Sequence, residues 1–193
     1  MTVITFVVDF HSTFRVGAAY PNDGVDLTYD EVEPLPPDHL KGIMKAEAEV
    51  LVRALGLNPT LIRDVFGTAA KPTEWSWFAA EADWSRPILR HRVAIDPDTH
   101  AAKQDHLVAS TSTMAERATF RVERHTKAGE DASAVAREAA LLRLAGRSVH
   151  HLGGWRRRGY GWVGVSLEED VDVAADIALL QGAPAAEGQE ALA

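Results

Sequence analysis

The residues best suited to chemistry in this sequence form one glycine-rich run, residues 153–161. Its members are Gly153, Gly154, Trp155, Arg156, Arg157, Arg158, Gly159, Tyr160 and Gly161. Glycine permits positive φ and lets a ligand approach the main chain, and guanidinium groups form planar forks that hold phosphate. The run therefore predicts a loop that binds a polyanion. Two simpler interpretations stay open: the arginines form a solvated surface turn, and the two aromatic residues pack beneath the loop instead of stacking on bases.

A second candidate lies near the other end of the chain, in a connection over residues 17–37. A Pro-Asn-Asp-Gly turn signal stands at 21–24, and the connection carries the carboxylates Asp23, Asp26 and Asp30. At about 20 residues it is longer than structural loops usually are, and long ordered loops are commonly functional. The alternative is an acidic surface loop that is only solvated.

Other catalytic motifs are absent or incomplete. Residues 67–73 begin with glycine but lack the Gly-Lys-Ser/Thr ending of a phosphate loop. None of the eight histidines forms a helical i,i+4 pair with a nearby carboxylate, so a zinc site is not expected. The chain has no cysteine, which excludes disulfides, thiolate metal sites and cysteine nucleophiles.

Charge is distributed unevenly along the chain. The net charge is −8, but residues 1–40 hold seven acids and one base, and residues 168–193 hold seven acids and no base. Residues 41–167 therefore carry a net charge of +5. Because the local field attracts a charged ligand, the acidic total does not exclude a nucleic-acid binder. The sequence shows neither an apolar run of about 18 residues nor a signal peptide, so we expect a cytoplasmic protein with no membrane partner.

Hydrophobic periodicity predicts the elements that position these loops. Strands are expected at 2–10, within 74–84, at 88–95, 117–124 and 160–167, and helices at 38–56, 59–66 and 132–145. Asp38 is the expected N-cap of the first helix, and Gly56 and Gly146 are expected to end the two long helices. Residues 96–115 are polar, which predicts irregular chain. The order predicts an α+β fold with a ferredoxin-like βαββαβ (RRM-like) core.

The domain is expected to span residues 1–167, with a central insertion at about 86–115. Residues 168–193 are acidic and rich in Ala, Glu, Gly and Pro towards their end, which predicts a flexible acidic tail that begins with a short helical piece. The hydrophobic fraction of 46% leaves ample material for one core.

The glycine-rich run and five further segments, in the same order, resemble the RAMP superfamily of CRISPR-associated proteins. The glycine-rich ending from Leu144 to Gly161 is similar to that family's signature. The five other segments are Arg15-Val16-Gly17, residues 35–45 with Leu40-Lys41-Gly42, Val65-Phe66-Gly67, residues 92–99 with Ile95-Asp96 and Thr99, and Thr119-Phe120. The closest likeness is to the backbone subunits of type III CRISPR effector complexes.

The resemblance implies an RNA-binding subunit of a ribonucleoprotein complex for antiviral defence. Its partners would be guide RNA, target RNA, other effector subunits and copies of itself along the guide. The central insertion would act as a thumb that splays one nucleotide of the guide–target duplex. The RNA contacts implied for this chain are Arg15, His39, Lys41, Lys45, Gly153, Gly154, Arg156, Arg157, Arg158 and Tyr160.

Some members of the family cleave target RNA, so the resemblance also implies a possible endonuclease activity for this chain. Asp26 best matches the family's catalytic aspartate, with Asp23 and Asp30 as alternatives. A divalent metal, Mg²⁺, would be held at Asp26, where the carboxylate positions the metal or orients the 2′-hydroxyl for attack. Two alternatives are a RAMP scaffold or capping subunit without catalysis, and a metal-independent endoribonuclease that trims the guide precursor with His11 or His39 as general base.

Overall fold

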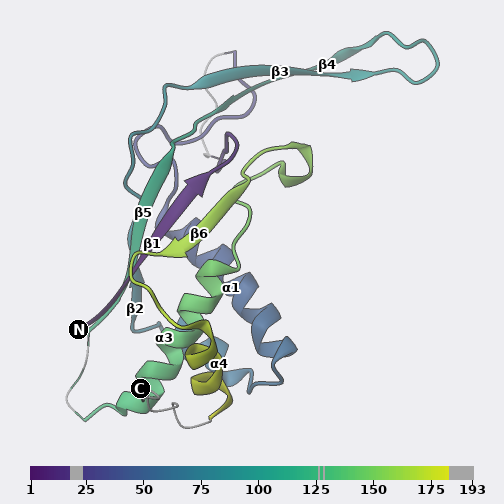
Figure 1. Cartoon of the computed structure of the whole chain (residues 1–193). Helices are drawn as coiled ribbons and strands as arrows, with labels where there is room; N and C mark the ends of the chain where they lie inside the picture. Colours follow the sequence, from purple (N-terminus) through teal and green to yellow (C-terminus); the bar gives the residue numbers. More distant parts are fainter. Residues whose placement is uncertain (18–23, 126, 128, 183–193) are drawn as a thin grey trace, which may run out of the picture.

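The computed structural model describes residues 1–17, 24–125, 127 and 129–182. Their centre is a four-stranded antiparallel sheet with the strand order β2-β5-β1-β6. The strands are β1 (Thr2–Phe10), β2 (Trp75–Trp77), β5 (Arg117–Arg124) and β6 (Val163–Leu167). Helices cover one face of this sheet, and a long two-stranded hairpin projects from one end of it (Figure 1). The predicted α+β class is confirmed.

The core lies between the sheet and the helices, and the strands contribute every second side chain to it. Along β1, Ile4, Phe6, Val8 and Phe10 are buried while the residues between them are not. This is the period of two that a sheet with one covered face requires. Phe6 stacks on Phe120 of β5 with ring centroids 4.8 Å apart, so the two central strands are joined by their side chains as well as by backbone hydrogen bonds.

Helix α1 (Pro37–Ala54) begins differently from the prediction. Pro36 occupies the N-cap position and Pro37 the first helical position, and Asp38 lies within the first turn. Proline suits this place because its missing N–H would have no helical acceptor. The expectation that Asp38 caps the helix was therefore wrong. A short helix, α2 (Thr60–Phe66), follows and ends at Gly67, where φ is 75°.

Helix α3 (Ala132–Arg147) begins where Asp131 accepts a 2.9 Å hydrogen bond from the amide of Ser133. It runs past Gly146, which was expected to end it. Gly146 lies inside the last turn, and a Cβ at this position would lie 2.2 Å from Cε1 of Phe6. The glycine is thus needed for close packing of the helix on β1 rather than for a turn.

The hairpin consists of β3 (Ile88–Ile95) and β4 (Ala102–Ser112). The first strand was predicted, but the prediction of irregular chain over 96–115 was wrong for β4. The outer half of β4, residues 102–107, is exposed, so it lacks the apolar alternation that identifies a half-buried strand. Cross-strand pairing places Val93 opposite Leu107. The hairpin carries four large exposed apolar side chains: Leu89, Val93, Ile95 and Leu107.

Helix α4 (Val173–Gln181) packs against α3. Asp172 caps it through the amide of Ala174, Leu180 is 1% exposed, and the carboxylate of Asp176 pairs with Arg143 of α3 (Nε to Oδ2, 2.9 Å). The short helical piece expected at the start of the tail is thus present at 173–181, but it packs on α3 instead of being flexible, and residues 183–193 lie outside the described residues. Within the described part of the chain, none of the helices has the length and apolar character to cross a bilayer.

Candidate nucleic-acid interface

The predicted glycine-rich loop folds as a tight turn, which we call the arginine turn (residues 153–161). Arg156–Arg158 form a single turn of 3-10 helix with exposed side chains. Trp155 before it and Gly159 after it both adopt left-handed backbone conformations, with φ of 60° and 78°. A tryptophan in this region is unusual, and its ring is half-buried, unlike the exposed arginines that follow it.

Two amides of the arginine turn are held by other parts of the chain. The amide of Gly153 donates to Nε2 of His39 (2.9 Å), and the amide of Gly154 donates to the carbonyl of Arg15 (2.9 Å). A Cβ at Gly153 would lie 2.2 Å from that carbonyl oxygen. These glycines therefore permit a close approach within the protein, and the turn presents arginine side chains, rather than those two amides, to a ligand.

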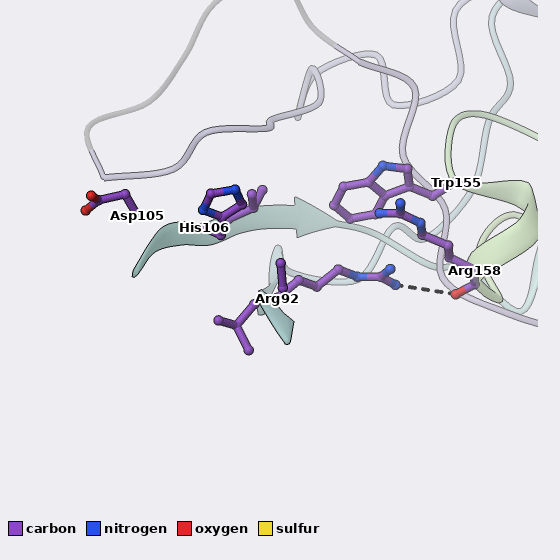
Figure 2. Close-up of a pocket in the computed structure, with 8 residues that line it drawn as sticks. Arg92, Asp105, His106, Trp155 and Arg158 are labelled. Carbon is purple, nitrogen blue, oxygen red and sulfur yellow. Dashed lines mark hydrogen bonds between the residues drawn. The ribbon is translucent and has the colours of Figure 1, made fainter. Parts of the chain in front are cut away.

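Three guanidinium groups converge on the half-buried indole ring of Trp155. Their Cζ atoms lie 4.5 Å (Arg92), 5.2 Å (Arg15) and 5.8 Å (Arg158) from the ring centre. Arg92 reaches across from β3 and also donates a 3.4 Å hydrogen bond to the carbonyl of Arg158 (Figure 2). Cation–π attraction to the indole partly offsets the repulsion between the three charges.

Tyr160 packs beneath the turn, which decides between the two predictions for its ring. It is 2% exposed and meets Trp155 edge to face, with ring centroids 5.5 Å apart. Arg92 and Arg90 lie 5.1 Å and 5.5 Å from its centre. Its hydroxyl is buried and has no hydrogen-bond partner among the described residues. In this structure Tyr160 supports the arginine cluster and is not accessible to a base.

A cavity of about 630 Å³ separates the arginine turn from the hairpin. Its walls are Trp155 and Arg158 on one side and β3 and β4 on the other, with Asp105 and His106 at the end away from the indole (Figure 2). Partial burial lowers the pKa of the Arg15 guanidinium, and the nearby Tyr160 opposes this effect. The cluster is thus a concentration of positive charge in a partly desolvated site, where an anion interacts more strongly than in bulk water.

His39 lies in the first turn of α1, facing the arginine turn. Burial lowers the pKa of its imidazole, and the positive charge of Arg156 lowers it further. His39, Asp38, Gly153 and Arg156 line a smaller cavity of about 310 Å³. The predicted His39 is therefore brought to the site, as an acceptor for the turn.

Of the two predicted lysines of α1, Lys41 points away from the arginine turn. The ammonium of Lys41 sits 5.2 Å from the ring centre of Trp77 on β2, and β2 forms the edge of the sheet opposite to β6. Lys45 is half-buried one turn further along the helix. Periodicity gives the helix but not the direction in which each long side chain points, so the structure does not bring Lys41 to the arginine turn.

The acidic loop, which we define as the described residues 24–30, runs along β4. Asp26 is exposed, its Oδ2 accepts a 2.8 Å hydrogen bond from the amide of Ala109, and its own amide donates to the Ala109 carbonyl (3.0 Å). Asp30 uses Oδ1 to accept from the amides of Val32 and Glu33. Asp23 lies outside the described residues. The loop is thus fastened to the base of the hairpin.

The described residues do not form a metal site around Asp26. No group of three or more histidine, aspartate or glutamate side chains suited to a metal ion occurs among them, and the carboxylate of Asp30 is engaged by backbone amides. Mg²⁺ is bound through one or two carboxylates together with further oxygen ligands. With its described neighbours, Asp26 therefore offers one carboxylate and not a complete set of protein ligands for a resident Mg²⁺ ion.

Arg15 joins the two candidate loops. Its carbonyl accepts a hydrogen bond from the amide of Gly154 in the arginine turn, and its Nη1 donates a long 3.4 Å hydrogen bond to the carbonyl of Thr28 in the acidic loop.

His11, the other histidine considered as a general base, is exposed and packs edge to face on Trp162 (ring centroids 5.5 Å apart).

Sequence reasoning missed Arg90 and Arg92 as site residues. One signal was present: in the predicted strand 88–95 the two arginines are two residues apart, so they share a face. That this face turns towards Trp155 depends on how the hairpin is placed, which no local pattern contains.

Known proteins share both the sequence pattern and the architecture of this chain. The model of the family described as "RAMPs: RAMP superfamily" matches residues 8–164, and no curated protein matches. Two solved structures are similar. One is a chain of the type III-B Cmr-beta complex bound to cognate target RNA, with TM-score 0.64 and 13% identity over 86% of this chain and 97% of that chain. The other is a chain of apo Cmr-beta, with TM-score 0.66 and 14% identity over 87% and 98%.

Proposed function

The chain belongs to the RAMP superfamily, and from this membership we propose that it is a guide-RNA-binding backbone subunit of a type III CRISPR interference complex. The observation that carries the proposal is the convergence of Arg15, Arg92 and Arg158 on Trp155. Among the described residues, none of the three forms a salt bridge with a carboxylate.

An RNA strand supplies what this cluster lacks. Gathering three cations costs free energy unless an anion offsets their repulsion, and phosphate accepts bidentate hydrogen bonds from guanidinium. The indole between them offers a surface on which a base can stack without sequence preference. Phosphate contacts give affinity and register, so the sequence would be read by guide–target pairing rather than by this protein.

The comparisons support the proposal through the fold. The similar chains come from structures described as Cmr-beta, one of them bound to target RNA, and the shared architecture includes nearly the whole of those chains. We assign the β2-β5-β1-β6 sheet to the ferredoxin-like arrangement and the β3–β4 hairpin to the thumb. On this assignment the cavity between hairpin and arginine turn holds guide RNA, and further copies and other effector subunits continue the assembly.

Target-RNA cleavage at Asp26 is a separate proposal. It is supported by one observation: the carboxylate is exposed and is held in place by the amide of Ala109 at the base of the hairpin. A non-catalytic scaffold is supported by the amide contacts of Asp26 and Asp30, which give both carboxylates a structural role in the acidic loop. The two proposals share the same RNA interface and differ only at the acidic loop.

The test of RNA binding uses the full chain, co-expressed with its neighbouring genes. We expect RNA to co-purify, and binding of a labelled single-stranded RNA to weaken steeply as salt rises, since phosphate contacts release counterions. Loss of the salt dependence, or no binding by the purified chain and its complex, would contradict the proposal.

A further inference from the structure

We propose that His39 is a positioning residue whose neutral imidazole holds the arginine turn in its binding conformation, so that protonation of His39 releases the turn and weakens RNA binding. The inference rests on the proposed function and adds a regulation of the same site. It starts from one contact, the hydrogen bond from the amide of Gly153 to Nε2 of His39 (2.9 Å).

This contact fixes the protonation state that the turn requires. An imidazole nitrogen accepts a hydrogen bond only when it carries no proton, and both nitrogens are donors in the cation. Neutral His39 with its proton on Nδ1 satisfies the Gly153 amide. Protonated His39 would point an N–H at that amide, so the contact is lost when the imidazole becomes charged.

The contact lies at the first residue of the arginine turn. This residue is Gly153, and Gly154 beside it is bonded to Arg15. The residues that follow, Trp155 and Arg156–Arg158, take their direction from these two anchors, because Trp155 is held at φ of 60° immediately after them. Removal of one anchor frees the turn to move the arginines and the indole apart.

The charges that face His39 favour the neutral form. Burial and the positive charge of Arg156 act in the same direction on its pKa, and the N-terminal turn of α1, in which His39 lies, also disfavours a cation. Asp38 on α1 is the one carboxylate among the described residues that line the same cavity, and Arg156 lines it from the arginine turn. The turn is therefore held at neutral pH and released as the pH falls.

If His39 instead contacted phosphate directly, the pH dependence of RNA binding would run in the opposite direction. A histidine that contacts phosphate as a cation strengthens RNA binding as the pH falls. A histidine that holds the turn as a neutral acceptor weakens RNA binding as the pH falls. The direction of the pH dependence therefore distinguishes the two roles, whatever the absolute affinity.

The experiment measures binding of single-stranded polyuridylate carrying a pH-insensitive fluorophore by the full chain, between about pH 8 and about pH 5. The range extends well below the ordinary histidine pKa because that of His39 is lowered. For the natural chain we expect binding to weaken by about three- to tenfold towards the acid end, beyond any change in a control. This is the factor that one net hydrogen bond contributes. His39→Gln supplies an acceptor that does not titrate, so it should keep neutral-pH affinity and lose this pH dependence. His39→Ala should bind about three- to tenfold more weakly throughout.

His150→Gln is the matched control, because His150 is exposed and lies just before the turn; it should keep the pH dependence of the natural chain. Binding that strengthens towards acid pH, or a pH dependence that survives in His39→Gln, would overturn the inference.

A second readout needs no RNA. In a glycine-labelled sample, the amide resonance of Gly153 should shift with the titration of His39, and this shift should vanish in His39→Gln. If RNA does not bind but the Gly153 resonance follows His39, the proposed function fails and the positioning contact stands. If RNA binds but Gly153 does not respond to pH, the inference fails and the proposed function stands.

Discussion

The guanidinium of Arg92 on β3 lies 4.5 Å from the centre of the Trp155 ring in the arginine turn. This contact closes the cavity between hairpin and turn at one end, and it joins two segments that are distant in sequence. It also makes Arg92 the member of the cluster whose removal tests the interface most directly.

Replacement of Arg92 should weaken RNA binding in two distinguishable ways. Arg92→Gln removes a charge, and we expect roughly tenfold weaker binding and a salt dependence reduced by about one phosphate contact. Arg92→Lys keeps the charge but loses the planar stack on Trp155, so it should weaken binding with an unchanged salt slope. Fluorescence anisotropy at several salt concentrations measures both. Arg53→Gln, in the last turn of α1, is the control and should bind normally.

Gly153→Ala should destabilise the chain more than Gly159→Ala. Both glycines have positive φ, 72° and 78°, but a Cβ at Gly153 would lie 2.2 Å from the Arg15 carbonyl, whereas nothing lies within 4 Å at Gly159. We expect a loss of about 2–4 kcal/mol in the free energy of unfolding for the first and about 1 kcal/mol for the second. Urea unfolding gives both values, and equal losses would contradict the close approach.

Asp26→Asn separates charge from loop structure. An asparagine oxygen can still accept from the amide of Ala109, so the acidic loop should keep its place while the negative charge is lost. If Asp26 cleaves, target-RNA cleavage by the assembled complex should disappear with guide binding unchanged. Asp30→Asn is the control, since that carboxylate binds backbone amides. Cleavage that persists in Asp26→Asn would show that the carboxylate charge is not needed.

Glu138→Ala should be strongly destabilising, although it is far from the arginine turn. Glu138 accepts from the indole of Trp75 (2.8 Å) and from Arg124 (2.6 Å), and its side chain is buried. Its removal leaves a buried cation with one partner fewer, for which we expect a loss of about 3 kcal/mol. Glu74→Ala removes an exposed, solvent-screened pair with Lys127 and should cost much less. Urea unfolding compares the two variants.

Helix α4 should contribute to stability. Leu180→Ala is expected to lower the free energy of unfolding by about 2–4 kcal/mol, because the side chain is 1% exposed against the core. Val173→Ala, at the exposed start of the helix, should change it by less than about 0.5 kcal/mol. If residues 173–181 were a flexible tail, both variants would unfold like the natural chain.

Secondary structure was predictable wherever one face of an element is buried. Strand β5 alternates between buried and accessible residues along its whole length, and its predicted bounds, 117–124, are those observed. The outer half of β4 has no covered face and gave no signal. The prediction at Gly146 failed for a related reason. This glycine leaves room for Phe6, and in the sequence a glycine required for packing cannot be told from a glycine that ends a helix.

The two loops of the candidate site were predictable from the sequence, but the side chains that tertiary packing brings together there were not. The composition of residues 153–161 indicated an anion-binding turn, and the acidic loop was identified by its length and charge. The approach of Arg92 to Trp155 and the use of His39 as an acceptor depend on tertiary packing. For the same reason Lys41, which belongs to the predicted helix start, points to Trp77 instead.

Arg15 is bonded to the arginine turn through its backbone and to the acidic loop through its side chain. A displacement of either loop must therefore break a bond to Arg15 or carry the other loop with it. The relative position of the arginine turn and the acidic loop is thus fixed in part by Arg15, whose backbone holds one loop and whose side chain holds the other.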